Sequence, residues 1–485
     1  MAEHPNANSI ISKAIPGIRW SILLKSFSQI LTWVATLVIV RHVTPEEYGM
    51  NAMLEVPFEI LTIFSLCGLD RAIIQAKTIE SQQLKSVFGL LLLINFLIFG
   101  VFFWGADLIS WYYKEPRLAT YVQALSICFL IAPFRIVPDA LLDRNLDFKT
   151  NATVNLSCAI ATSLGALALA LQGAGIWALI VAKILGVALP ALVLAVVRPW
   201  FILPSFKLSE ISHLIWFGGS MLFMILSHTL ANKVPALIAG PIVGAEELGY
   251  FSLAMYFAFL PLSKIMPIVN QAIFPVFSRL QREKEQAKRY YRKSIRLIAL
   301  AFFPITFGLA AVGEEFVLVF LGGQWRAATN LLVAMAVVMP CRMIFNTYLP
   351  ILNSMGCVRL TNAASAIMLA AVTLASALGI RWGMLGLTLA WSFVIPFTMM
   401  VIVRMSREAV GISMRRLLIE IGPALIASSI MMVCVAGFKA WMPIADPKWL
   451  LAYEILLGAC VYPLVLRLFF PAALREVKAA MSKRQ

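Results

Sequence analysis

Long apolar runs separated by short polar segments extend along almost the whole chain. A helix needs about 20 mostly apolar residues to cross a bilayer. By this measure the pattern predicts an all-α membrane protein with about 14 spanning helices and no loop large enough for a further soluble domain. The predicted spans are 20–40, 49–69, 85–106, 118–140, 152–171, 175–197, 214–239, 248–271, 295–313, 328–351, 360–380, 384–403, 417–438 and 449–468.

The composition supports this prediction and excludes several functions. The chain is 61% hydrophobic and 13% charged, whereas soluble domains are about 45–50% apolar and about 25% charged. Its seven cysteines and four histidines form no metal-ligand spacing, and no phosphate-binding loop or nucleophilic catalytic set is present. We therefore predict no enzyme activity, no metal and no cofactor, apart from coupling to protons or sodium.

The distribution of Lys and Arg predicts the orientation. With the N-terminus inside, 27 of these residues fall in inner segments and 7 in outer segments, as expected if basic loops stay in the cytoplasm. Both termini are therefore expected in the cytoplasm. The net charge of +16 reflects this bias rather than nucleic-acid binding. The basic loop predicted at 279–296 fits attraction to anionic lipids, and recruitment of an anionic substrate headgroup is the alternative.

Short matching strings indicate an internal repeat. Residues 45–50 match 245–250, and 133–135 match 340–342, at similar places relative to the predicted spans. A six-helix repeat keeps both copies in one orientation, as in transporters that bind substrate at the repeat interface. The predicted domains are an N-terminal lobe, a C-terminal lobe and two further helices with a tail, at 1–206, 207–405 and 406–485. The paired glutamates at 46–47 and 246–247 are expected to cap the helices that follow them.

Charged residues inside the predicted spans suggest a polar cavity. Six cations lie there, against few acids, chiefly Glu55 and Glu59. Each cation costs at least ~2.5–3.5 kcal/mol at mid-membrane, so each needs water, a partner or a ligand. Polar stripes on several helices favour a shared wet cavity. The six cations are Lys25, Arg135, Lys183, Lys233, Lys264 and Arg342.

Simpler roles remain open for these residues. Arg135 can pair with Asp139 one turn later, and Glu55 can form a structural bridge to Lys25. Snorkelling to an interface is the alternative for the lysines, with even weight for the pair at 183 and 233. Arg342 has only Asn346 among polar residues one turn away, which favours a cavity role.

Three strings carry a resemblance to a known family. They are Ile39-Val-Arg-His-Val-Thr-Pro-Glu-Glu-Tyr-Gly49, Ala140-Leu-Leu-Asp-Arg-Asn-Leu-Asp-Phe-Lys149 and Phe274-Pro-Val-Phe-Ser-Arg-Leu-Gln281. These resemble Wzx-type polysaccharide flippases of the multidrug/oligosaccharidyl-lipid/polysaccharide exporter superfamily. The resemblance implies a bacterial inner-membrane protein that moves undecaprenyl-pyrophosphate-linked oligosaccharides by alternating access. It also implies ion coupling and cavity cations, here Lys25, Arg135, Lys264 and Arg342.

The resulting hypothesis is a lipid-linked oligosaccharide flippase. Arginine and lysine suit the diphosphate, because one offers a planar fork and the other a point charge. The predicted substrate-binding residues are Arg135, Arg342, Lys25, Lys264, Gln29, Asn232 and Asn346. Glu55 and Glu59 are the predicted ion-coupling residues. Expected partners are membrane lipids and polysaccharide polymerase or assembly proteins, with no nucleic acid. The alternatives are an organic-cation exporter of the same superfamily and a non-transporting scaffold.

Overall fold

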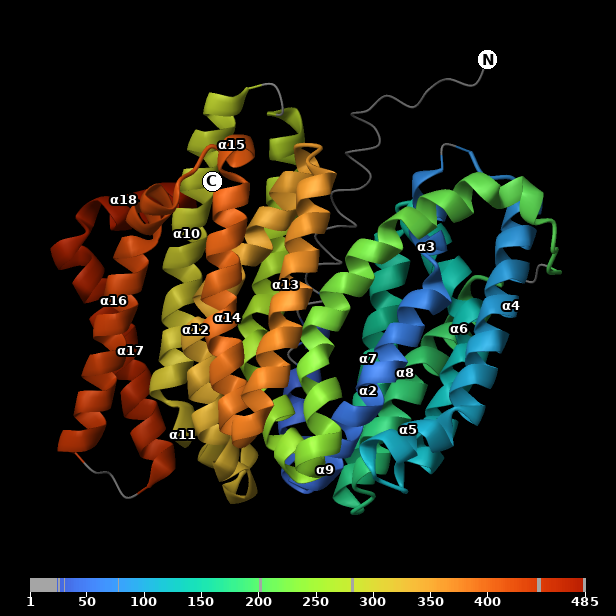
Figure 1. The fold of residues 1–485 in the computed structure, drawn as a ribbon, viewed down its shortest axis with the longest axis horizontal. Helices are drawn as coiled ribbons and strands as arrows, with labels where there is room; N and C mark the ends of the chain where they lie inside the picture. The colour runs from blue at the N-terminus through green and yellow to red at the C-terminus, as the bar shows by residue number, and fades with distance from the viewer. Residues whose placement is uncertain are drawn as a thin grey trace. The chain divides into compact units, whose positions relative to one another are not determined.

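The structure is a computed structural model, and the residues that it describes are 24, 27–29, 31–76, 78–199, 203–280, 283–442 and 446–482. Every regular element within these ranges is helical, as predicted. The chain forms two compact units, Met1–Lys233 and Val234–Gln485. Figure 1 draws the helices of both units.

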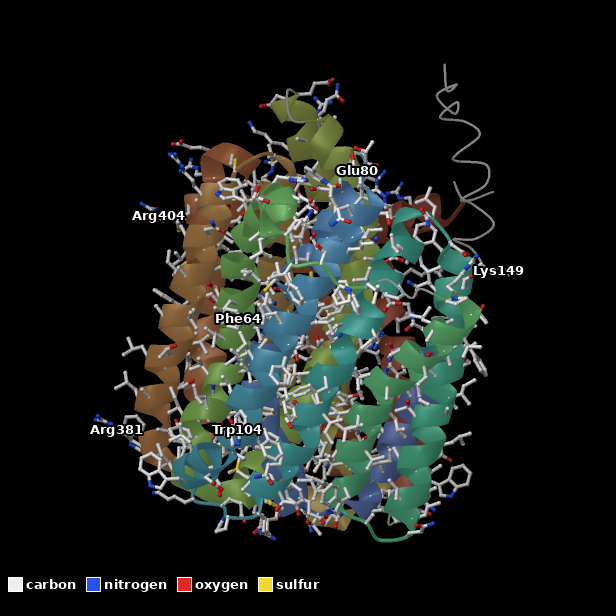
Figure 2. All side chains as sticks on the ribbon, turned by 90° about the vertical axis from the view of Figure 1, so that its right-hand side faces the viewer. Phe64, Glu80, Trp104, Lys149, Arg381 and Arg404 are labelled. Atoms are coloured by element: carbon white, nitrogen blue, oxygen red, sulfur yellow. The ribbon has the colours of Figure 1, made fainter. Side chains whose placement is uncertain are left out.

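The first unit contains the helices from α2 to α8 and the start of α9 (Figure 1). Neighbouring pairs include α4 with α6 and α7 with α8. In Figure 2, Glu80 and Trp104 lie at opposite ends of α4. The bounds are α2 Pro45–Leu66, α3 Leu69–Gln75, α4 Ser81–Trp104, α5 Ala106–Tyr113, α6 Leu118–Arg144, α7 Phe148–Leu171, α8 Ile176–Val197 and η1 Leu208–Ile211. Residues 27–29 and 31–42 are also helical.

The second unit begins inside α9 (Ser212–Arg279), which consists of two helices joined at Gly244. The φ angle of Gly244 is 84°, a left-handed value that glycine adopts readily. The remaining bounds are α10 Lys284–Ala311, α11 Gly313–Phe316, η2 Val317–Leu321, η3 Gly323–Ala328, α12 Thr329–Ser354, α13 Val358–Gly379, η4 Ile380–Trp382, α14 Gly383–Met405, α15 Arg407–Val410, α16 Met414–Trp441, α17 Pro447–Phe469 and α18 Pro471–Ser482. Arg381 and Arg404 mark the two ends of α14 in Figure 2.

Eleven stretches of the described chain are long and apolar enough to cross a membrane. Two of them, Ile225–Met266 and Val358–Met405, contain a break, at Gly244 and at η4 respectively. A shorter apolar helix covers Phe27–His42. The sequence pattern predicted separate spans on both sides of each break, because glycine and polar residues interrupt the apolar runs there.

One predicted loop is wrong. The basic segment 279–296 was expected as a loop, but α10 already begins at Lys284. Its basic residues extend the apolar helix rather than precede it, and Arg296 lies inside the helix. Arg296 bonds Glu420 of α16 through two nitrogens, and its Nη1 lies 2.8 Å from Glu476 Oε1 of α18. This basic end therefore also joins α10 to two C-terminal helices.

The predicted helix cap at 46–47 is confirmed for Glu47. Thr44 is the N-cap of α2, and its hydroxyl accepts a hydrogen bond from the backbone of Glu47. The Glu47 carboxylate accepts one in return from the backbone of Thr44 at 2.9 Å, which completes a capping box. The same carboxylate also accepts from the backbone N–H of Ile176 at 3.3 Å. The Glu47 side chain thus accepts hydrogen bonds from backbone N–H groups at the N-termini of both α2 and α8.

A proline in α10 leaves one backbone carbonyl without its usual hydrogen-bond donor, and a side chain of another helix supplies the donor. Pro304 lacks an N–H, so the carbonyl of Leu300 has no partner one turn later in α10. The Tyr462 hydroxyl of α17 donates to this carbonyl at 2.8 Å. In a lipid environment such freed backbone groups need a partner from a neighbouring helix. The contact therefore holds α17 against α10.

A glycine contact in the first unit allows a direct stability test. A Cβ added at Gly218 would lie 2.4 Å from the carbonyl oxygen of Cys67, while one at the adjacent Gly219 would meet no atom within 4 Å. We expect Gly218→Ala to lower the free energy of unfolding by about 1–3 kcal/mol through overpacking. Gly219→Ala should leave it unchanged or slightly raised. Thermal unfolding of the purified variants in detergent measures both, and equal effects would contradict this packing.

Candidate functional site

A charged cluster lies on three spanning helices of the first unit. The Glu55 carboxylate of α2 lies 3.0 Å from Lys183 Nζ of α8 and 3.0 Å from Lys233 Nζ of α9. Lys233 Nζ is also 2.8 Å from the Glu59 carboxylate. We call these four residues the Glu–Lys cluster. It brings together groups separated by more than a hundred residues in the sequence.

Helical spacing on α2 explains the acidic half of the cluster. Asn51, Glu55 and Glu59 are four residues apart, so they share one face of the helix. The Asn51 amide donates to the Glu55 carboxylate at 3.2 Å, which orients it toward the lysines. Lys183 Nζ also lies 5.9 Å from the centre of the Phe58 ring, within reach of a cation–π contact.

The cluster is electrically balanced and only partly buried. Its two carboxylates face two ammonium groups, and the side chains are 20–43% exposed. Four charges at mid-membrane would be costly alone, and pairing removes most of that cost. Because the ammonium groups keep partial access, an incoming anion can reach them without unfolding the helices. An anionic ligand would compete with Glu55 for both lysines.

Arg135 occupies a different polar network on α6, α7 and α8. Its Nε lies 3.0 Å from an oxygen of Asp139, the pairing that the sequence left open. Its Nη1 donates to the backbone carbonyl of Gly186 at 2.8 Å, and Nη2 donates to the Asn155 side chain at 3.4 Å. Pro190 lies four residues after Gly186 and cannot supply the usual N–H. Arg135 therefore supplies the hydrogen-bond donor that Pro190 cannot give to the Gly186 carbonyl of α8.

This role predicts a coupled pair of substitutions. Arg135→Ala should lower the free energy of unfolding by about 1–3 kcal/mol, because the Gly186 carbonyl loses its donor. Pro190→Ala restores a backbone N–H to that carbonyl. In the Pro190→Ala background, the loss caused by Arg135→Ala should therefore be smaller. Chemical or thermal unfolding of the four proteins measures this coupling, and strictly additive effects would contradict it.

Arg342 is the most deeply buried of the predicted cations that the structure describes. It is 1% exposed on α12, where Pro340 lies two residues earlier. Its guanidinium lies over the ring of Phe259, 5.4 Å from the ring centre, and Nη1 lies 3.8 Å from the sulfur of Met368. Its contacts thus include an aromatic face and a polarizable sulfur of the second unit.

The other predicted binding residues are dispersed. Gln29 is half-buried on the first helix, and the Asn232 amide donates to the backbone of His228 at 2.9 Å. Asn346 has a buried Oδ1 with no partner among the described residues, and Lys264 is half-buried on α9. Lys25 lies outside the described residues, and so does its suggested bridge to Glu55.

Two cluster residues were absent from the predicted site. Lys183 and Lys233 were counted among the intramembrane cations, but snorkelling was an equal alternative for both. Each instead bonds Glu55 at 3.0 Å. The available signal was the pair of acids one turn apart on α2, which needs cations from other helices. Within the described part of the chain, no group of three or more His, Cys, Asp or Glu residues is arranged to hold a metal.

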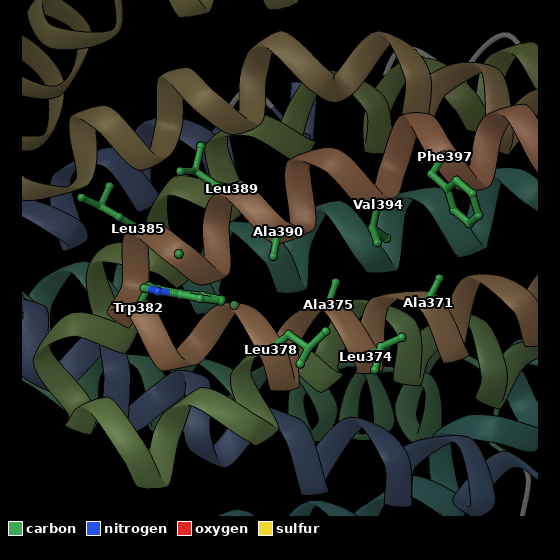
Figure 3. A pocket seen from close by; sticks show the side chains of 12 residues that line it. Ala371, Leu374, Ala375, Leu378, Trp382, Leu385, Leu389, Ala390, Val394 and Phe397 are labelled. Atoms are coloured by element: carbon green, nitrogen blue, oxygen red, sulfur yellow. The ribbon is translucent and has the colours of Figure 1, made fainter.

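An apolar furrow runs between α13 and α14 in the second unit. Figure 3 shows side chains from both helices along it, including Trp382 and Phe397. Its volume is about 660 Å³ and its lining contains no charged residue. The furrow therefore suits a hydrocarbon chain and offers nothing to a sugar or a phosphate.

Comparison with known proteins gives consistent matches. A family model described as "Polysaccharide biosynthesis protein" matches residues 38–330, more than half of the chain. The succinoglycan biosynthesis transport protein ExoT of Rhizobium meliloti (strain 1021) is 27% identical over 353 residues, covering 70% of this chain and 69% of ExoT. The lipopolysaccharide biosynthesis protein WzxC of Escherichia coli (strain K12) is 24% identical over 344 residues, covering 70% of this chain and 69% of WzxC.

A solved structure supports the fold. The lipid II flippase MurJ, in an inward closed conformation, superposes with a TM-score of 0.78. The match covers 94% of this chain and 100% of MurJ at 15% sequence identity. At that identity the likeness establishes the fold alone.

Proposed function

The chain belongs to the polysaccharide biosynthesis protein family, and from this premise we propose that it is a flippase for lipid-linked oligosaccharides. It moves undecaprenyl-diphosphate-linked repeat units across the bacterial inner membrane for exopolysaccharide, capsule or lipopolysaccharide synthesis. The family match and the similarity to WzxC and ExoT confirm the resemblance to polysaccharide flippases that the sequence predicted. The MurJ-like fold and the membrane-spanning helices fit this activity.

The observation that carries the proposal at residue level is the Glu–Lys cluster. The diphosphate is the group of the substrate that hydrocarbon solvates worst, so a carrier must supply cations to it. The ammonium groups of Lys183 and Lys233 approach one carboxylate from two helices at 3.0 Å each. A diphosphate offers the same kind of acceptor and can take the place of Glu55 between them.

In this proposal the carboxylates are internal counter-ions. When the carrier is empty, Glu55 and Glu59 neutralise the lysines. The protein can then return from its outward-facing to its inward-facing state without substrate. When the diphosphate displaces them, the freed carboxylates need a proton or sodium ion. Substrate binding and cation uptake then favour each other by linkage.

This linkage has a consequence for the driving force. A cation taken up together with substrate leaves the cytoplasm with it, so an inward cation gradient does not drive export through this cluster. Net direction then comes from consumption of the product outside. The predicted coupling role of Glu55 and Glu59 thus becomes one of charge compensation.

Other predicted contacts fit the remainder of the substrate. We assign Gln29, Asn232 and Asn346 to sugar hydroxyls, and Arg342, Lys264 and Lys25 to anionic groups that the cluster does not hold. Arg135 supports α8, which carries Lys183, through its bond to Gly186. It therefore acts as a positioning residue for the cluster.

The finer architecture belongs to the same proposal. Reading the two broken stretches as two spans each, and adding the helix over Phe27–His42, matches the fourteen spans that the sequence predicts. An even count puts both termini on the same side of the membrane, and the Lys and Arg distribution favours the cytoplasm. Two six-helix lobes at 1–206 and 207–405 would then alternate access, with 406–485 as an addition that contacts the polymerase or other assembly proteins.

The organic-cation exporter is the weaker alternative. Such a substrate needs carboxylates and aromatic faces that are free to bind it, whereas lysines occupy the acids of the Glu–Lys cluster. A scaffold without transport activity would not need paired charges in its spanning helices at all. The organic-cation exporter can be separated from the flippase by one genetic experiment.

Deletion of the gene in its own host tests the activity. We expect undecaprenyl-diphosphate-linked oligosaccharide to accumulate in the cytoplasmic leaflet and polymer to disappear, and the wild-type gene should restore both. Lipid extraction and the accessibility of the sugar to a membrane-impermeant reagent measure this. Unchanged polymer together with increased sensitivity to organic cations would instead support the drug exporter.

A further inference from the structure

A second charge cluster, which contains two buried carboxyl groups, lies in the second unit, where α17 packs against α11 and α16 (Figure 1). Glu454 of α17 is 1% exposed and Glu315 of α11 is 3% exposed. Lys439 of α16 lies 2.6 Å from Glu315 Oε1 and 2.8 Å from Glu314 Oε2. Arg326 lies 3.2 Å from Glu314 Oε1. These five residues comprise three carboxyl groups and two cations.

Hydrogen-bond accounting singles out Glu454. Within the described residues, neither of its carboxyl oxygens has a donor, and Oε2 of Glu315 has none either. The two side chains lie within hydrogen-bonding range of each other. Two carboxylates can only accept, so a bond between them requires a proton on one. An ionised carboxylate buried without a donor would cost several kcal/mol.

The cluster has one carboxyl group more than it has cations, so one bound proton would balance its charge. The hydrogen bond from Lys439 lowers the pKa of the Glu314 carboxyl, which is therefore ionised at neutral pH. Lys439 and Arg326 supply two positive charges against the three carboxyl groups, and both cations contact Glu314 or Glu315. Glu454 then has no positive charge left to pair with. The segment η2, which also contacts α17, contributes only apolar side chains.

We propose that Glu454 and Glu315 form a proton-binding site in which one proton is shared between the two carboxyl groups. The site is distinct from the Glu–Lys cluster and goes beyond the proposed transport of substrate. When the proton leaves to water, no covalent bond breaks other than O–H, and two carboxylates remain face to face. Their repulsion loosens α17 from α11. The bound proton thus holds the last spanning helix in place.

Infrared spectroscopy of the full chain in nanodiscs tests this site. A protonated buried carboxyl gives a carbonyl stretch that an ionised one lacks. We expect wild-type protein to show this band at neutral pH, to lose it on alkaline titration, and to lack it in Glu454→Gln. Glu420→Gln is the matched control, because Glu420 is buried at 4% exposure but bonded to Arg296, so its loss should leave the band unchanged.

Stability gives an independent readout. A group that holds a proton only in the folded state loses its stabilising effect as pH rises. The unfolding temperature of wild type should therefore fall at alkaline pH more than that of Glu454→Gln. If Glu454→Gln does not fold, Glu315→Gln replaces it. An amide donor at 315 should stabilise ionised Glu454 and shift loss of the band to lower pH.

Three results would overturn the proposal. A band that persists in Glu454→Gln would place the proton elsewhere. A band in Glu315→Gln that titrates as in wild type would show that the two groups share no proton. Loss of the band on adding sodium chloride at constant pH would identify a metal-cation site instead.

Discussion

Replacing Lys183 and Lys233 together by glutamine is expected to abolish export of the lipid-linked oligosaccharide. Each ammonium–phosphate contact contributes about 1.5–3 kcal/mol, so each loss should weaken diphosphate binding roughly 10- to 150-fold. Each single variant should retain reduced export. Cellular polymer yield and the sidedness of the lipid-linked sugar in membrane vesicles measure these effects.

A matched control separates binding from folding. Arg296 also bridges two carboxylates, those of Glu420 and Glu476, and its side chain is 28% exposed. Arg296→Gln removes a comparable ion-paired cation that is not part of the Glu–Lys cluster. It should lower the unfolding temperature while export per folded molecule is kept. If Arg296→Gln and the double lysine variant lost export equally, the assignment of the lysines to substrate would be wrong.

Glu55→Gln is expected to act in the opposite direction on binding. Removal of the carboxylate leaves a neutral acceptor between the lysines, so an incoming diphosphate meets a weaker competitor. The difference between charged and neutral hydrogen bonds is roughly 1–1.5 kcal/mol, which corresponds to about tenfold tighter binding. Turnover should nevertheless fall, because the empty site then carries uncompensated positive charge.

The pH dependence distinguishes this effect from a general improvement of the site. In wild type, the carboxylate that the diphosphate displaces is proposed to take up a proton, so affinity for the diphosphate should rise as pH falls. Glu55→Gln should flatten this dependence. The acid Glu59 is the matched comparison: Glu59→Gln removes one of the two carboxylates on Lys233 but leaves Glu55 between the lysines, so it should give a smaller change. An unchanged pH profile in Glu55→Gln would contradict the exchange of carboxylate for phosphate.

The sequence predicts the helical architecture well because hydrophobic length alone decides whether a segment spans a bilayer. Spans ended where polar residues or glycine interrupted the apolar runs. The start of α10 was mispredicted because Lys and Arg are good helix formers. The basic residues were expected to lie outside the helix, but the helix continues through them from Lys284. The capping box at Thr44 was predictable from local spacing.

The site was less accessible to prediction. Periodicity places Asn51, Glu55 and Glu59 on one face of α2, but it does not say which helix meets that face. The partners Lys183 and Lys233 come from α8 and α9, and only the packed structure pairs them. Arg135 is a second example, in which the sequence showed one partner but not the other.

For Arg135, the neighbour Asp139 was visible one turn away, while its bond to Gly186 depends on how α6 packs against α8. The proline rule identifies the carbonyl of Gly186 as needing a donor. It does not identify the residue that supplies it. Long-range packing therefore decides whether an intramembrane cation serves substrate or scaffold.

Calorimetric binding of farnesyl diphosphate, with farnesol as the control for the apolar tail, tests the central claim most directly. The lysines of the Glu–Lys cluster are proposed to exchange Glu55 for a diphosphate. The affinity for farnesyl diphosphate should therefore be highest in Glu55→Gln, intermediate in wild type and lost in the double variant Lys183→Gln, Lys233→Gln, with no such order for farnesol. Equal affinity of the three proteins for farnesyl diphosphate would contradict the account.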